Sequence, residues 1–359
     1  GFYGFETMQH KPPIDPTTLS RWRSRLGADK LEILLKQTID TAKQRNLLKP
    51  KDLNEVNVDT TVQPKAIAFP TDSRLYFKMT RALVREARKA GIVLRQSYVR
   101  VTKACLVQQG RYAHARQMNR SRKHQRKLHT ILGRVTRDIG RKISQCSAGK
   151  RRAHLEGLLE RSDQLLKQTR TSTPKLYSIH EPHVECIAKG KAGKKYEFGN
   201  KVSLAVSSRK SWVVGAMSLR GNPYDGHTLK DQIVQVQGIL GEGVAEKVFV
   251  DRGYRGHGYE GFEQVHVDRL KRGTIPKRLW RLMKRRAAIE PSIGHMKSEH
   301  RLERNRLKGQ AGDAINAILS AAAMNFSKLV AWMRHFLAFL HALFSNLPLC
   351  SVHRPPAFR

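Results

Sequence analysis

A long basic segment interrupts the strand-forming parts of this chain, and it constrains the fold more than any other feature. Before it, Val56, Val58 and Val62 alternate with polar residues, which is the two-residue period of a half-buried strand. From residue 74 to residue 170 the strand pattern disappears, and 26 Lys or Arg stand against 5 Asp or Glu. Strand patterns resume near Tyr196. The chain therefore has to build its sheet from strands on both sides of a large insertion.

The insertion is predicted to be all-helical. Apolar residues recur in it at helical spacing with basic residues between them, which is typical of amphipathic helices packed as a hairpin or small bundle. These apolar residues are Leu128, Ile131, Leu132, Val135, Ile139 and Ile143, followed by Leu155, Leu158, Leu159, Leu165 and Leu166.

The rest of the sequence predicts a mixed α/β fold with helical ends. After the insertion come a hairpin over residues 202–206 and 212–219, a helix over 227–240 and a buried strand over 246–251. This order favours a right-handed crossover to a parallel strand. Helices are also expected over residues 16–27, ending at Gly27, and then over a segment with Leu31, Ile33, Leu34 and Leu35 on its apolar side. From Pro276 to Leu347 the pattern is mostly helical, with breaks near Pro291 and residues 309–312.

Five regions follow from this organisation. They are an N-terminal helical segment (1–53), the first strand (54–73), the basic insertion (74–171), the remaining sheet region (172–310) and C-terminal apolar helices (311–359). Four cysteines, Cys105, Cys146, Cys186 and Cys350, are scattered without a CxxC pair. That pattern excludes a zinc ribbon and a disulfide framework, and it is typical of the cytoplasm.

The charge of the chain indicates a polyanionic partner. Its 68 Lys and Arg and 29 Asp and Glu give a net charge of +39, which favours binding to a polyanion. Nucleic acid is the expected partner, although an anionic membrane attracts cations by the same physics. Residues 314–347 are apolar, but Lys, Arg and His interrupt them before the roughly 20 residues that a membrane span needs. We therefore expect buried helices there and no membrane partner.

Three carboxylates stand where metal chemistry can occur. Asp59 lies within the first strand, on the face opposite the valines, Asp251 ends the last strand, and Glu290 follows in the helical region. Ligands of open α/β sheets bind at the carboxyl ends of strands. Carboxylates from two strands and a packed helix can converge on Mg²⁺, which prefers oxygen ligands. Two such ions can clamp the attacking and leaving oxygens of a phosphodiester.

Structural roles compete with this interpretation. Asp59 could face solvent, Asp251 could open an Asx-turn, and Glu290 could form an ion pair within its helix. Asp72 has the position of a helix cap, whereas Asp225 lies in a loop and is kept as a reserve candidate.

A set of short blocks carries a resemblance to a known family. Two of them are VFVDRGY at 248–254 and RRAAIEPSIGHMK at 285–297. The others are PIDPTTLSRW at 13–22, YSIHEPH at 177–183, YEFG at 196–199, GNPYDGH at 221–227 and NRLKG at 305–309. Together they resemble the DDE transposases of bacterial insertion sequences, with the insertion-sequence five family as the nearest group. Arg286, Glu290 and Lys297 match the end of that family's Tyr-Arg-Glu-Lys signature, and the resemblance covers about residues 1–330.

This resemblance implies a ribonuclease H-like domain with flanking helices, into which the basic helical block is inserted after the first strand. It makes Asp59, Asp251 and Glu290 the catalytic triad and the ligands of two Mg²⁺ ions, with Mn²⁺ as an alternative. The basic residues expected to contact DNA are Arg286, Lys297, Arg252, Arg122, Lys123, Arg126 and Lys127. Transposon ends and target DNA would be the double-stranded substrates of a homodimer in the nucleoid-associated cytoplasm.

The chain also departs from the family pattern. Met283 stands where the signature has tyrosine, and Pro291 directly after Glu290 disfavours a continuous helix from Arg286 to Lys297. The family usually has a further helical segment before the point that matches Gly1, so we expect a truncated reading frame.

The sequence thus predicts a transposase that cleaves DNA at insertion-sequence ends and transfers the strand to a target. A truncated, non-catalytic DNA-binding remnant and a ribonuclease H-like nuclease without strand joining are the alternatives.

Overall fold

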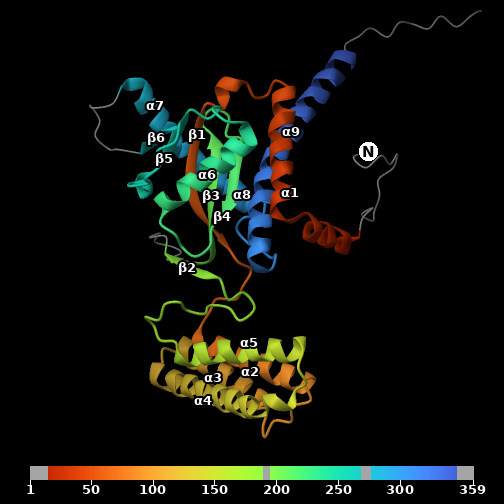
Figure 1. The fold of residues 1–359 in the computed structure, drawn as a ribbon, viewed down its shortest axis with the longest axis vertical. Coiled ribbons are helices and arrows are strands. Elements are labelled where there is room, and N and C mark those ends of the chain that lie inside the picture. Colours follow the sequence, from red (N-terminus) through yellow and green to blue (C-terminus); the bar gives the residue numbers. More distant parts are fainter. Residues whose placement is uncertain (1–14, 189–194, 268–275, 346–359) are drawn as a thin grey trace, which may run out of the picture.

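The computed structural model describes residues 15–188, 195–267 and 276–345, which form a sheet lobe and a helical insertion (Figure 1). Each of the two parts has its own cluster of buried hydrophobic residues. The mixed α/β class predicted from the sequence is confirmed. The ribonuclease H-like assignment stays a prediction.

The sheet is mixed and has β1 at its centre. Its strands are β1 (Glu55–Pro64), β2 (Glu185–Ala188), β3 (Tyr196–Ser207), β4 (Val213–Ser218), β5 (Lys247–Val250) and β6 (Gln264–Val267). They lie in the order β2-β3-β1-β5-β6. β4 also pairs with β3, along residues 202–206, next to the stretch 196–199 that pairs with β2. β3 runs antiparallel to β1, β2 and β4, whereas β5 is parallel to both β1 and β6. Strands on both sides of the insertion therefore meet at β1, as the sequence requires.

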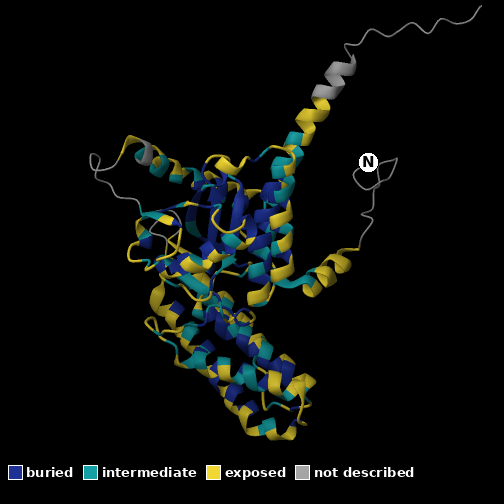
Figure 2. Cartoon of the chain, turned by 45° about the horizontal axis from the view of Figure 1, so that its top comes forward, coloured by how far each residue is buried: buried dark blue, intermediate teal, exposed yellow. Residues whose placement is uncertain are grey.

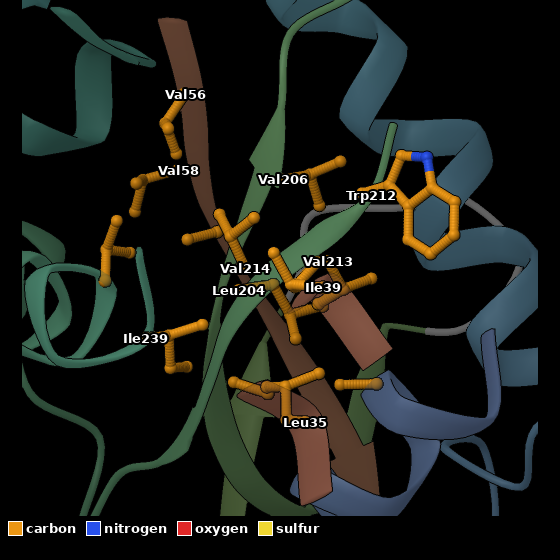
Figure 3. Packing of buried hydrophobic residues seen from close by; sticks show 14 of the residues in the cluster. Leu35, Ile39, Val56, Val58, Leu204, Val206, Trp212, Val213, Val214 and Ile239 are labelled. Carbon is orange, nitrogen blue, oxygen red and sulfur yellow. The ribbon is translucent and has the colours of Figure 1, made fainter. Parts of the chain in front are cut away.

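Three helices pack around β3 and β4. They are α1 (Pro16–Gln44), α6 (Asp225–Leu240) and α9 (Gly309–Ser345). Leu35 and Ile39 of α1 and Ile239 of α6 lie in the same cluster as Leu204 and Val214 (Figure 3). The predicted hairpin and the helix after it are thus present as β3, β4 and α6, and α6 leads to the parallel strand β5.

The insertion is a four-helix unit. Its helices are α2 (Asp72–Lys89), α3 (Val99–His114), α4 (Met118–Lys142) and α5 (Lys150–Lys167). Leu83, Leu128, Leu132 and Leu155 are fully buried among them, and the basic residues remain outside. Figure 2 shows this division of buried and exposed residues in the lower part of the molecule.

A buried ion cluster joins the two ends of the insertion to the sheet lobe. Lys65 directly follows β1, and its Nζ lies 2.5 Å from Asp313 Oδ1 and 3.1 Å from Glu181 Oε2. Glu181 lies between α5 and β2, and Asp313 lies near the start of α9. The three side chains are at most 6% exposed, so this cluster fixes the neck of the insertion.

Several details differ from the sequence-based expectation. β2 and β6 were not expected. α1 contains the predicted break at Gly27 (φ 67°), but Ile33, expected on its apolar side, is 57% exposed. The C-terminal helical region consists of α7 (Lys277–Arg285), a 3₁₀ turn (Arg286–Ala288) and α8 (Ile289–Ser298) before α9. Pro291 lies in the first turn of α8, where its missing amide hydrogen breaks no helical bond, so Glu290 and Lys297 share one helix.

The long helix α9 is buried only in part. Ala317, Ile318 and Ala321 pack in the sheet core, and Asn325 accepts a hydrogen bond from the Val213 amide at 2.9 Å. Residues 309–338 are long and apolar enough to cross a membrane by length and composition, and 44% of the apolar window is buried. The prediction of buried helices therefore holds for the first half of α9. The second half extends away from the sheet (Figure 1).

Candidate active site

The sheet brings Asp59 and Asp251 to the same level on neighbouring strands. β1 and β5 are parallel, and their pairing puts Asn57 opposite Phe249. If the same register continues for two more residues, Asp59 comes level with Asp251, just past the end of β5. The charge of Asp251 acts on Asp59, which agrees with this placement. Residues at equivalent positions of neighbouring parallel strands point to the same face of the sheet. Because β5 ends at Val250, Asp251 lies at the carboxyl end of the strand, where ligands of such sheets bind.

Asp251 also caps the turn that follows it. Its Oδ1 accepts a hydrogen bond from the Gly253 amide at 2.9 Å, which starts the 3₁₀ turn Arg252–Tyr254. This is the Asx-turn role considered above. The bond fixes the carboxylate at the end of β5.

A third aspartate, Asp225, joins the pair. It begins α6, and its Oδ1 accepts a hydrogen bond from Thr60 Oγ1 at 2.9 Å and lies 3.0 Å from Lys201 Nζ. Its other oxygen faces the turn after Asp251. A Cβ on Gly253 would lie 3.0 Å from both Asp225 Oδ2 and Asp251 Oδ1, so a glycine at this position leaves room for both carboxylates.

The aspartates concentrate negative charge in a partly buried place. Burial, and then the charge of Asp251, raise the pKa of Asp59 from 3.8 to about 6, although Arg286 and a backbone amide oppose the rise. Tyr254 is fully buried beside them. Burial is the largest cause that raises the pKa of its phenol above the ordinary value, and the charges of Asp59, Asp225 and Asp251 raise it further. The nearby cations therefore do not fully offset this charge.

Two predicted phosphate-binding residues form ion pairs with carboxylates of the protein. Arg286 Nη1 lies 3.8 Å from Asp59 Oδ2, and Lys297 Nζ lies 4.0 Å from Glu197 Oε2. Arg286 is placed there because the turn that contains it lies against β1, where Asn57 Nδ2 donates a hydrogen bond to the carbonyl of the preceding residue.

Glu290 lies on a helix and not on the sheet. It lies in the first turn of α8 with an exposed side chain, whereas its neighbour Ile289 is fully buried. Within residues 15–188, 195–267 and 276–345, no three His, Cys, Asp or Glu side chains are close enough together to hold a metal ion. The structure therefore supplies the pair Asp59 and Asp251, and the role of Glu290 stays a prediction.

The other predicted DNA contacts lie at the surface. Arg252 is exposed and directly follows Asp251. A basic quartet on α4 is exposed as well, and it consists of Arg122, Lys123, Arg126 and Lys127.

Comparison with known proteins gives one family match. Residues 259–330 match the family model described as a transposase DDE domain. The match supports a DDE transposase family. It contains Arg286, Glu290 and Lys297, and it begins after Asp59 and Asp251.

One curated relative is an uncharacterized protein, ORF8 of the nfe locus of Rhizobium meliloti. It is 57% identical over 116 residues, which is 32% of this chain and 56% of the relative. The chain thus matches about half the length of this relative. No solved structure matches the chain.

From the sequence, Asp225 is a reserve candidate and Tyr254 has no role, and the structure places both near Asp59 and Asp251. Asp225 is the first residue of α6, the helix that follows β4. Tyr254 follows Asp251 by three residues, within the same turn. Both signals were available in the printed sequence.

Proposed function

We propose that this chain is a transposase that cuts DNA at insertion-sequence ends and joins the freed strand to target DNA. The observation that carries the proposal is the parallel pairing of β1, which holds Asp59, with β5, which Asp251 directly follows, in a chain whose residues 259–330 match a transposase DDE domain. The strand order around β1 supports a ribonuclease H-like domain as part of this proposal, with the insertion-sequence five family as the nearest relatives.

Asp59 and Asp251 offer carboxylate oxygens, the ligands that Mg²⁺ prefers. Burial and then the charge of Asp251 raise the pKa of Asp59, and a bound cation would favour its charged form. Asp59 and Asp251 would hold the metal, together with Glu290, as the resemblance implies, or with Asp225. Two Mg²⁺ or Mn²⁺ ions bound there would supply Lewis-acid activation of water and of the phosphodiester.

The protein's own groups position these carboxylates. The Gly253 amide fixes Asp251, and Thr60 with Lys201 fixes Asp225. Arg286 sits beside Asp59, where its guanidinium can approach a phosphate that enters the site. A homodimer on two DNA ends, in the cytoplasm near the nucleoid, completes the proposal.

The exposed position of Glu290 favours one rival function. If the chain cannot complete a metal site, it is a DNA-binding remnant without catalysis. A nuclease that cuts but does not join remains the third alternative.

Strand joining separates these three functions. A duplex that carries the element's end with a free 3′-hydroxyl is incubated with a supercoiled plasmid and Mg²⁺. We expect joined products, because a transposase uses that hydroxyl as the nucleophile. Cut plasmid without joined products would indicate the nuclease, and an untouched plasmid with bound DNA would indicate the remnant.

A further inference from the structure

The insertion contains a large basic groove that the candidate active site does not use. A hollow of about 970 Å³ lies between α2 and the start of α3. Its cationic lining consists of Lys78, Arg81, Arg85, Arg88 and Arg100. No acidic residue is part of the lining.

Four of these cations form a stripe along one side of α2. Lys78, Arg81, Arg85 and Arg88 are spaced by three, four and three residues, which is the repeat of one helix face. The opposite face, with Leu75, Met79 and Leu83, is buried in the bundle and keeps the stripe turned outward. At 1.5 Å per residue the stripe is about 15 Å long.

Most of this charge is not used inside the protein. Among the described residues, no ion pair involves Lys78, Arg81, Arg88 or Arg100. Arg85 pairs with Glu86 at 2.8 Å and is still 67% exposed. Arg81 makes a cation–π contact with Phe77 at 5.5 Å from the ring centroid. Because Lys78, Arg81, Arg88 and Arg100 have no carboxylate partner among the described residues, their charge is available to a ligand.

The groove opens beside the path that leads back to the sheet. Ile179 and His180, which line it, lie in the segment between α5 and β2. α2 itself begins eight residues after the end of β1, the strand that holds Asp59. In Figure 1, by contrast, α4 with its basic quartet runs along the side of the insertion farthest from the sheet.

We propose that the groove between α2 and α3 is a seat for the phosphate backbone of duplex DNA, and that it carries more of the phosphate contact than the basic quartet of α4. The choice of DNA as the ligand rests on the proposed function. A stripe of about 15 Å is long enough to contact neighbouring phosphates of one strand, each of which carries one negative charge. The contact carries no sequence information, because arginine and lysine bind phosphates whatever the base.

The test compares two double variants of the full chain. Arg81→Gln with Arg88→Gln removes two groove charges, and Arg122→Gln with Arg126→Gln removes two from α4. All four residues are exposed arginines. Binding to a fluorescent duplex of arbitrary sequence is measured from 50 to 200 mM salt, and thermal unfolding checks that each variant folds.

The groove variant is expected to lower the slope of log affinity against log salt by about 2. Its loss of affinity between 50 and 200 mM salt should then be about 12-fold smaller than that of the unchanged chain. The α4 variant should change the slope less. An unchanged slope in the groove variant, or a larger change in the α4 variant, would overturn the proposal.

Two more outcomes separate this inference from the proposed function. If the groove variant loses DNA binding while even the unchanged chain never joins strands, the groove stands and the transposase proposal fails. If the groove variant loses binding to phosphatidylserine vesicles but keeps its DNA affinity, the groove serves a membrane and the inference fails.

Discussion

Asp59 carries an energetic cost that follows from its surroundings. A rise of its pKa from 3.8 to about 6 corresponds to about 3 kcal/mol for charging it in the folded protein. Below about pH 4 the residue is protonated in both states and the cost is absent. Between about pH 4 and pH 6 the unfolded chain loses the proton first, so this group makes stability fall as pH rises.

Asp59→Asn is therefore expected to stabilise the protein above about pH 6. We expect a gain of about 1–3 kcal/mol in the free energy of unfolding at pH 8 and almost none at pH 4. Urea unfolding at the two pH values measures it. A variant less stable than the unchanged chain at pH 8 would show that Arg286 already neutralises the carboxylate.

Gly253 has a separate role at the residue scale. A methyl group there would lie 3.0 Å from Asp225 Oδ2 and Asp251 Oδ1, so Gly253→Ala should push the carboxylates apart. We expect loss of Mg²⁺-dependent cleavage with the fold retained. Gly238→Ala is the control, because nothing lies within 4 Å of its added methyl group, and it should gain about 0.5–1 kcal/mol of stability. Equal cleavage by both variants would contradict the role of Gly253.

At the scale of elements, the sequence predicted what periodicity encodes. The valines of β1, the hairpin, α6 and the leucines of the insertion repeat at clear periods, and each lies where the pattern indicates. β2 and β6 could not be predicted, because they are four-residue strands that pair with one neighbour each. Asp251 could be predicted because it directly follows a strand, and Asp59 because it lies within a clearly alternating strand. Glu290 depends on how α8 turns against β1, which no local pattern specifies.

The ion cluster at the neck of the insertion is also a tertiary feature. Asp313→Ala would leave Lys65 buried with Glu181 as its remaining ion-pair partner. We expect a loss of about 3–5 kcal/mol of stability, because removing one partner strands a buried charge. Urea unfolding measures it, and Asp163→Ala on the exposed side of α5 is the control. A loss below about 1 kcal/mol would show that Glu181 alone suffices for Lys65.

At the scale of the whole molecule, positive charge is densest in the insertion. The insertion holds 26 Lys or Arg against 5 Asp or Glu between residues 74 and 170, whereas the sheet lobe holds the local group of Asp59, Asp225 and Asp251. The buried neck links the two parts through Lys65, Glu181 and Asp313.

The central claim is that Asp59 and Asp251 form a metal-dependent centre for cutting DNA. Its most direct test is cleavage of a labelled duplex with the element's ends, with and without Mg²⁺, by the unchanged chain and by Asp251→Ala. DNA affinity is measured in parallel. We predict cleavage only by the unchanged chain with Mg²⁺, and nearly equal DNA affinity for both. Cleavage that persists in Asp251→Ala, or an unchanged chain that binds the ends and never cuts them, would contradict the claim.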